Sequence, residues 1–184
     1  SASEIYFRLT AVDTVTPPNE SAHSDVYGYA PASRTERILI VDGFDRFGGS
    51  GSWAQPWHSF VFTHGRAIAP NGFAFESCAN EQIISGAINL QDYAAVFWLL
   101  GDESTTDETF NNTEQAKVKA YLQNGGKLFV SGSEIAWDLD TGARGGASDE
   151  AFLRDYLKAD YVSDDANSFS VSGAGIFSGL NFSY

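Results

Sequence analysis

The sequence feature that most constrains the fold is a continuous apolar run at residues 92–100, DYAAVFWLL. The run is apolar after its first residue, and it is shorter than the roughly 20 residues that a membrane-spanning helix needs. It is also too continuous for a strand that exposes one face to water. We therefore expect a strand buried on both faces, as in a parallel sheet covered by helices.

A helix and a second buried strand are expected after this run. Residues 112–115 (NTEQ) open the helix, because Asn112 can cap it and Gln115 stands at the capping-box position. Glycines at 125–126 end the helix, and residues 127–130 form the second strand. Parallel strands joined by a helix make a right-handed βαβ unit.

The rest of the chain alternates in the same way, which predicts an α/β fold with an open, doubly wound, mainly parallel sheet. Residues 161–184 alternate polar and apolar residues with glycines, so we expect antiparallel or edge strands there, with an exposed or borrowed sheet edge nearby. The remaining expected elements are strands at 37–41 and 73–77, a partly helical segment at 53–69, a brief helix at 80–85, the segment 135–139, and a helix capped by Ser148.

The N-terminal residues predict a separate β-hairpin. Residues 5–12 and 24–29 alternate like half-exposed strands around a turn that contains prolines. A lone hairpin is marginally stable in water, so this one must pack on the following domain or belong with further strands. The predicted organisation is a hairpin module at 1–31, a linker at 32–36 and an α/β domain at 37–184.

Composition limits the function classes. The chain has 184 residues, 43% of them hydrophobic, and a formal charge of −13. Nucleic acid and anionic membranes would repel that charge, so neither is an expected partner. The charge fits solubility outside the cell, and the alternative explanation is an acidic cation-binding surface. A single cysteine, Cys78, cannot form an internal disulfide, and no run reaches the length of a membrane span.

The candidate site is at the carboxyl ends of the expected parallel strands, where ligands of open α/β sheets bind. Grouped carboxylates raise one another's pKa, so such a group must hold a proton, a cation or a basic partner. The alternative is that these acids are ordinary solvent-facing strand ends and helix caps. Glu134 is of particular interest because it follows a buried strand by few residues. The polar strand ends are Asp42 and Asp45, then Gly101, Asp102 and Glu103, then Ser131, Ser133 and Glu134.

Four motifs carry a resemblance to a known family: residues 40–46 (IVDGFDR), 80–81 (NE), 98–104 (WLLGDES) and 131–135 (SGSEI). As a set they resemble secreted bacterial proteins that join fibronectin type III modules to a class I glutamine amidotransferase-like domain and that are often labelled xanthan lyase or N-acetylmuramoyl-L-alanine amidase. The central unit itself resembles that superfamily, whose fold is flavodoxin-like: residues 92–93 (DY), the strand to Gly101, the helix that ends at 125–126 and the strand that enters 131–134 (SGSE). The resemblance covers residues 37 to about 160 and implies a secreted protein.

The hairpin carries its own resemblance. Residues 6–12 (YFRLTAV), 19–21 (NES), 24–26 (SDV) and Pro31 resemble the last two strands of a fibronectin type III domain. The expected partners are therefore the remaining segments of a parent protein, or a second chain that completes the sheet.

The site departs from the superfamily pattern, which implies a cysteine nucleophile with a later histidine and glutamate. Ser133 or Ser131 stands near that position here, and a serine needs a base within hydrogen-bond reach. The histidines all precede the serines, and His64 is the candidate base because the first helix could bring it to the strand edge. No histidine, cysteine and aspartate spacing fits zinc, so we expect no cofactor.

Two functions remain. The first is a non-catalytic or degenerate accessory module of a secreted protein acting on polysaccharide or cell wall, which binds glycan through Trp53, Trp57 and Trp137 or spaces other domains. The second is a hydrolase or lyase acting on polysaccharide or peptidoglycan, with Ser133 and Glu134 near the chemistry. A calcium site in the acidic edge is a third possibility.

Overall fold

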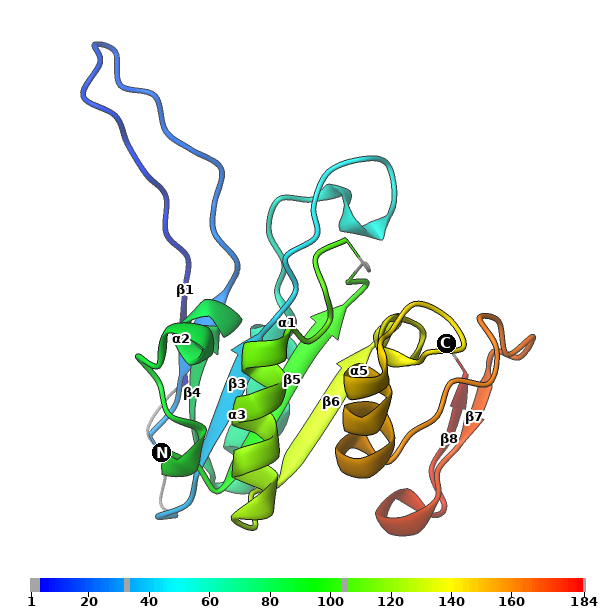
Figure 1. Ribbon diagram of the computed structural model, residues 1–184. Helices are drawn as coiled ribbons and strands as arrows, with labels where there is room; N and C mark the ends of the chain where they lie inside the picture. The colour runs from blue at the N-terminus through cyan, green and yellow to red at the C-terminus, as the bar shows by residue number, and fades with distance from the viewer. Residues whose placement is uncertain (1–3, 32–33, 104–105, 184) are drawn as a thin grey trace.

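The computed structural model describes residues 4–31, 34–103 and 106–183, and its centre is a four-stranded parallel sheet. The strands lie in the order β4-β3-β5-β6 (Figure 1). Their bounds are Arg37–Asp42 for β3, Ala74–Ala79 for β4, Ala95–Gly101 for β5 and Leu128–Gly132 for β6. The expected α/β fold with a mainly parallel sheet is confirmed at this level.

Helices cover the two faces of the sheet unequally. In Figure 1, α2 (Asn80–Ser85), α3 (Asn112–Gln123) and α5 (Ala147–Phe152) lie on the near face, and α1 (Phe60–Ile68) lies behind it. Other elements are short: α4 (Ile135–Leu139), a π-helical turn (Leu153–Leu157), and 3₁₀ turns at Ser52–Ala54, Ala69–Asn71, Leu90–Asp92 and Gly175–Phe177.

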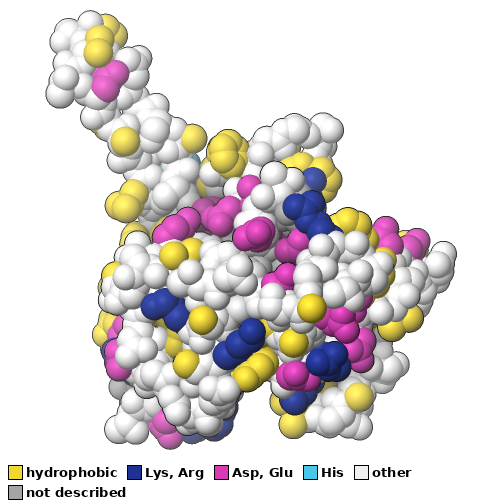
Figure 2. All heavy atoms as spheres, in the orientation of Figure 1, with side chains coloured by type: hydrophobic (Ala, Val, Ile, Leu, Met, Phe, Trp, Pro, Cys, Tyr) yellow, Lys and Arg dark blue, Asp and Glu magenta, His cyan; other side chains and the backbone are white. Residues whose placement is uncertain are grey.

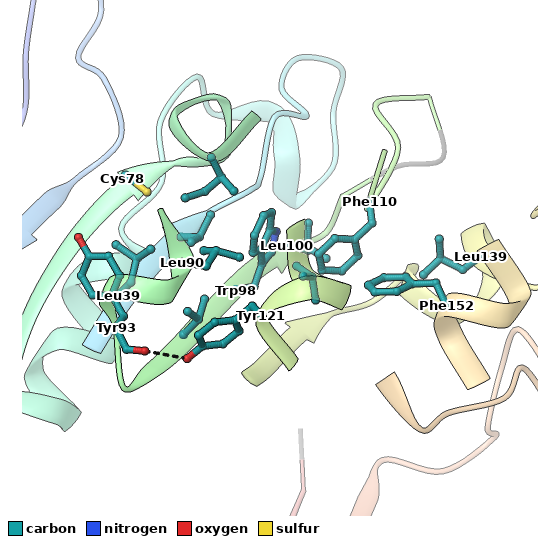
Figure 3. Close-up of a cluster of buried hydrophobic side chains, with 14 of the residues drawn as sticks. Leu39, Cys78, Leu90, Tyr93, Trp98, Leu100, Phe110, Tyr121, Leu139 and Phe152 are labelled. Atoms are coloured by element: carbon teal, nitrogen blue, oxygen red, sulfur yellow. Dashed lines mark hydrogen bonds between the residues drawn. The ribbon is translucent and has the colours of Figure 1, made fainter. Parts of the chain in front are cut away.

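The larger core fills the space between the sheet and α2, α3 and α5. Figure 3 shows Trp98 of β5 at its centre, facing Phe110, which in turn meets Phe152 of α5. The ring centroids of Trp98 and Phe110 are 5.0 Å apart. The hydroxyl of Tyr121 donates to the Tyr93 carbonyl at 3.1 Å and ties α3 to the segment before β5. The residues of β5 are thus buried as the apolar run predicted.

Helix starts differ from the sequence prediction by a residue or two. The N-cap of α3 is Asn111 and not Asn112, and its capping-box partner is Glu114 and not Gln115. Similarly, α5 begins after Gly146, with Asp149 accepting from the Gly146 amide, so Ser148 is not the cap. Both corrections have one cause: neighbouring polar residues can all serve as caps, and the packing of the helix selects one.

The side of β6 that faces α1 is only partly covered. Phe129 is 36% exposed there, because α1 lies mainly over β3 and β4. Residues 161–184 contain the expected antiparallel strands, β7 (Ser170–Ser172) and β8 (Asn181–Ser183). These two strands form a sheet of their own and pair with no strand of the central sheet in the described chain.

The N-terminal hairpin packs on the α/β domain through its base. Strands β1 (Ile5–Phe7) and β2 (Tyr27–Tyr29) pair antiparallel, Ala30 bridges to Phe75 of β4, and the Gly28 amide donates to the Ser77 hydroxyl at 2.7 Å. The residues between these strands form the arm that projects away in Figure 1. The strands are shorter than predicted because some backbone amides along the arm donate to serine hydroxyls and not to carbonyls of the opposite strand. For example, the Leu9 amide donates to Ser24 Oγ.

Two sequence predictions fall partly outside the described residues: the linker, at positions 32 and 33, and Ser104 of the acidic turn after β5. Within the part that is described, no helix combines the length and the apolar character needed to cross a bilayer.

Candidate functional site

The strand order brings the carboxyl ends of β3, β5 and β6 side by side, as the site hypothesis required. A cavity of about 780 Å³ opens at this edge. Four of the residues selected from the sequence line it, namely Gly101, Asp102, Ser131 and Ser133. The remaining lining residues are Phe44, His58, Phe60, Gly132, Val171 and Phe182. The volume lies within the range of small-molecule sites, which is about 300–1,000 Å³.

Small residues keep this cavity open. Gly101 has a φ of +47°, and a Cβ atom there would lie 2.7 Å from the Phe60 ring. A Cβ on Gly132 would similarly lie 2.7 Å from Leu100. Glycine is therefore needed at the end of β5 both for the left-handed backbone and for the close approach of Phe60. Ser131 and Ser133 are exposed, and the Ser133 amide donates to the Gly101 carbonyl at 2.9 Å.

His58 is the histidine that the structure brings to the cavity. Its ring stacks on Phe60 at 5.4 Å and meets the edge of Phe44 at 4.1 Å. Asp25 of the hairpin base accepts a short hydrogen bond from the His58 backbone amide, and its Oδ1 lies 3.4 Å from His58 Nδ1. Burial lowers the pKa of His58, and the negative charges of Asp25 and Asp102 oppose that shift. Nε2 is buried and has no hydrogen-bond partner among the described residues.

His64, the base proposed from the sequence, lies elsewhere. Its Nδ1 is 2.9 Å from the Phe60 carbonyl within its own helix, and its ring packs beside Phe97 and Phe129. It is not among the residues that line the cavity. Of the two histidines in the segment 53–69, the structure thus brings His58 and not His64 to the cavity that Ser131 and Ser133 line.

Asp42 ends β3 and is not among the residues that line this cavity. It is 4% exposed, and neither of its carboxylate oxygens has a partner of normal hydrogen-bond geometry in the described structure. Burial raises its pKa to about 7, and the charges of Asp25, Asp45 and Glu81 add to that rise while the Phe44 amide opposes it. A carboxyl group in this setting holds a proton near neutral pH.

Other acids of the edge have structural partners. Glu103 is buried and accepts the Asp45 amide at 2.5 Å, while Glu114 accepts from Asn111 in the capping box and from Asn80 Nδ2 at 2.9 Å. Burial is the main cause that raises the pKa of Glu114 to about 7. It also raises the pKa of Asp45. Asp45 and Glu103 therefore support the loops around the cavity but do not line it.

Glu134 is the N-cap residue of α4 and is half-buried. Burial raises its pKa, as do the charges of Asp164, Asp138 and Asp102, whereas Arg46 lowers it. Arg46 donates from Nη1 to the Asp102 carbonyl at 3.1 Å and lies over the Trp53 ring, 3.5 Å from its centroid. Glu134 thus borders the cavity beside Ser133 without being one of its lining residues.

The tryptophans suggested for glycan binding are half-buried and lie outside the cavity. Arginine guanidinium groups cover two of them, with Arg46 over Trp53 and Arg8 over Trp57. Trp53 and Trp57 therefore do not present a bare ring face to a sugar.

Within the described ranges, no group of three or more histidine, cysteine, aspartate and glutamate side chains has an arrangement that could hold a metal ion. The acids at this edge lie close enough for their charges to raise one another's pKa, as Asp45 does for Asp42 and Asp102 does for Glu134.

No family model, curated protein or solved structure matches the chain.

Sequence reasoning missed Asp25 and His58, which are 33 residues apart. The only available signal was a histidine in the segment after β3, and that signal applied equally to His64. Phe44 and Phe60 were missed as walls of the site because an apolar side chain near a strand end is usually a core residue.

Proposed function

We propose that the chain is a glycan-binding accessory module of a secreted protein that acts on polysaccharide or cell wall. The observation that carries the proposal is the cavity at the carboxyl edge of the sheet, which combines aromatic rings with hydroxyl groups and in which no described serine is hydrogen-bonded to a histidine. A sugar ring has an apolar face that packs on aromatic rings and an edge of hydroxyls that forms hydrogen bonds. Phe44, Phe60 and Phe182 supply aromatic rings for the apolar face of the sugar, and Ser131 and Ser133 supply hydrogen-bonding groups for its hydroxyls.

The absence of an activated serine supports binding over catalysis. A serine nucleophile requires a base within hydrogen-bond reach. Neither Ser131 nor Ser133 makes a hydrogen bond to a histidine among the described residues, and the Nε2 atom of His58 is shielded. For His58 to act as a base, the rings of Phe44 and Phe60 that pack on it would have to move, so that its Nε2 atom could reach a serine hydroxyl.

Retention on immobilised glycans tests the proposal. The intact chain is passed over a panel of polysaccharides and peptidoglycan, and retention is compared with that of Ser131→Phe, in which the added ring fills the cavity. The matched control is Ser148→Phe on α5, an exposed serine outside the cavity. We expect the wild type and Ser148→Phe to be retained and Ser131→Phe to be released. Equal behaviour of all three proteins, retained or not, would refute binding through this cavity.

A hydrolase is the second candidate, and one observation favours it. His58 lines the same cavity as the two serines, and Asp25 Oδ1 lies 3.4 Å from its Nδ1, which is the order of contacts in a serine, histidine and aspartate site. The same glycan panel is therefore assayed for hydrolysis with wild type, Ser133→Ala and Glu134→Gln. Hydrolysis by the wild type that disappears in Ser133→Ala would establish this candidate in place of the first.

A further inference from the structure

We propose that a second cavity, between the N-terminal arm and α1, binds the end of a peptide chain that carries both a carboxylate and an amine, as a C-terminal lysine does. This cavity has a volume of about 720 Å³ and shares no lining residue with the cavity at the carboxyl edge of the sheet. The inference goes beyond the glycan-binding function and does not depend on it.

The hairpin supplies one wall of the second cavity and α1 supplies the other. Tyr6 of β1 and Arg8 and Thr10 of the arm alternate along the chain, so their side chains leave the same side of an extended backbone. Phe62 in the first turn of α1 and Ser59, its N-cap residue, line the opposite side. The volume again lies in the range of small-molecule sites, which is about 300–1,000 Å³.

Arg8 offers a set of hydrogen-bond donors to a ligand. Its guanidinium carbon lies over the Trp57 ring, 4.7 Å from the centroid, and this contact holds the group against the body of the protein. The N–H donors of a guanidinium point outward in its plane, so a ring beneath it does not use them. Among the described residues, no ion pair or hydrogen bond involves the Arg8 side chain. A ligand carboxylate can accept two of these donors side by side.

Glu20 supplies the opposite charge from the returning half of the arm. Its Oε1 accepts from the Thr10 hydroxyl at 2.6 Å, and the described chain gives it no ion pair. Thr10 and Arg8 are two residues apart, which is about 7 Å along an extended chain. The cavity thus presents a cation and an anion that are separated by roughly this distance. A C-terminal lysine carries its carboxylate and its amine on either side of a four-carbon stem, which spans a comparable length.

Aromatic rings give the stem of such a ligand an apolar surface. Tyr6, Phe7 and Phe62 line the cavity, and the rings of Tyr6 and Phe62 meet edge to face with their centroids 4.8 Å apart. A lysine side chain buries its methylene groups along apolar surface while its charged end stays among polar groups. The ring faces also attract an ammonium group. The cavity therefore complements the stem of the ligand as well as its two charged ends.

The charge of the surroundings disfavours a purely acidic ligand. The chain has a formal charge of −13, and Figure 2 shows acidic side chains gathered on the body beneath the arm. A uronate oligomer would satisfy Arg8 with one carboxylate but would bring others toward Glu20, and like charges repel. A neutral sugar would leave both ions without a partner. A ligand with both signs of charge pairs with each of them.

Calorimetry with the intact chain and four probes tests the inference. The first probe is an N-terminally acetylated alanyl-alanyl-lysine peptide with a free carboxylate. The second is its C-terminal amide, the third is the same peptide with the lysine amine acetylated, and the fourth is a galacturonate tetramer. We expect the first peptide to bind most tightly and each modified peptide to bind roughly fivefold more weakly, because each has lost one charged contact at a partly solvated site. The galacturonate tetramer should not bind.

Two variants locate the two ends of the ligand. Arg8→Gln should weaken binding of the first peptide but not of the C-terminal amide, which lacks the group that Arg8 binds. Glu20→Gln should weaken binding of the first peptide but not of the peptide with the acetylated amine. The matched control is Arg34→Gln, because Arg34 lies over the Phe73 ring and outside the cavity. It should bind all the probes as the wild type does, and so should Ser131→Phe, which fills the other cavity.

Every other outcome overturns the inference. Equal affinities for the three peptides would show that the two charges are not recognised, and no binding of the first peptide would show that the cavity takes no such ligand. Tighter binding of the galacturonate tetramer would indicate a site for anions alone. Loss of peptide binding in Ser131→Phe would place the peptide in the first cavity. The comparison of probes on the wild type needs no variant, so it holds even if Arg8→Gln does not fold.

Discussion

Replacing Asp42 by asparagine should change how the stability of the protein depends on pH. Asp42 is 4% exposed, it has no hydrogen-bond partner of normal geometry among the described residues, and its pKa is raised from 3.8 to about 7. At a pH well below 3.8 this carboxyl group is protonated in both the folded and the unfolded chain. As the pH rises toward 7 it ionises in the unfolded chain only, so the folded state loses stability across that window.

The magnitude follows from the two pKa values. Each pH unit between them is worth about 1.4 kcal/mol, so the complete loss is about 4 kcal/mol by pH 8. That is a large share of the roughly 5–15 kcal/mol by which domains are stable. Asparagine stays neutral at every pH and removes this loss. Its buried amide costs about 1–3 kcal/mol at all pH values, which shifts the curve without changing its slope.

Urea denaturation followed by tryptophan fluorescence, at pH values from 4 to 8, measures the effect. Other buried acids such as Glu114 also titrate in this range, so the informative quantity is the difference in unfolding free energy between Asp42→Asn and wild type. We expect this difference to grow in favour of the variant by about 4 kcal/mol over the window. Asp155→Asn, at an exposed aspartate in the π-helical turn Leu153–Leu157, should follow the wild type. Parallel curves for Asp42→Asn and wild type would refute the reasoning.

Three further predictions concern single positions. Asn111→Ala removes the cap that accepts from the Thr113 and Glu114 amides, and it should lower the unfolding free energy by about 1 kcal/mol in the same urea assay. Gly101→Ala places a Cβ 2.7 Å from Phe60 at a φ of +47°, so thermal melting should show a loss of at least about 1 kcal/mol, whereas an unchanged melting temperature would contradict the close contact. Burial raises the pKa of Cys78 to about 12, so a thiol reagent at pH 8 should label it only after urea unfolding, and rapid labelling of the folded protein would be inconsistent with its burial.

Much of the α/β layout was predictable because it depends on short-range patterns. The apolar run before Gly101 indicated a buried strand, the glycines at 125–126 ended α3, and the brief helix at 80–85 lies where it was expected. A continuous apolar run and a glycine that stops a helix each determine the backbone conformation within a few residues of their own position. The convergence of Gly101, Asp102 and the serines of β6 on one edge followed from the parallel arrangement of their strands.

Only the tertiary structure decided which side chains belong to the site. The sequence contained His58 and His64 in one segment, and packing placed the first between Phe44 and Phe60 and the second beside Phe97. Asp25 reached His58 because the base of the hairpin docks on the sheet, a contact that no local pattern encodes. The apolar runs of the sequence thus determined the strands of the sheet and the edge at which the cavity lies. The contents of that edge were determined by contacts between residues far apart in the chain, because burial and charge depend on everything that packs around a group.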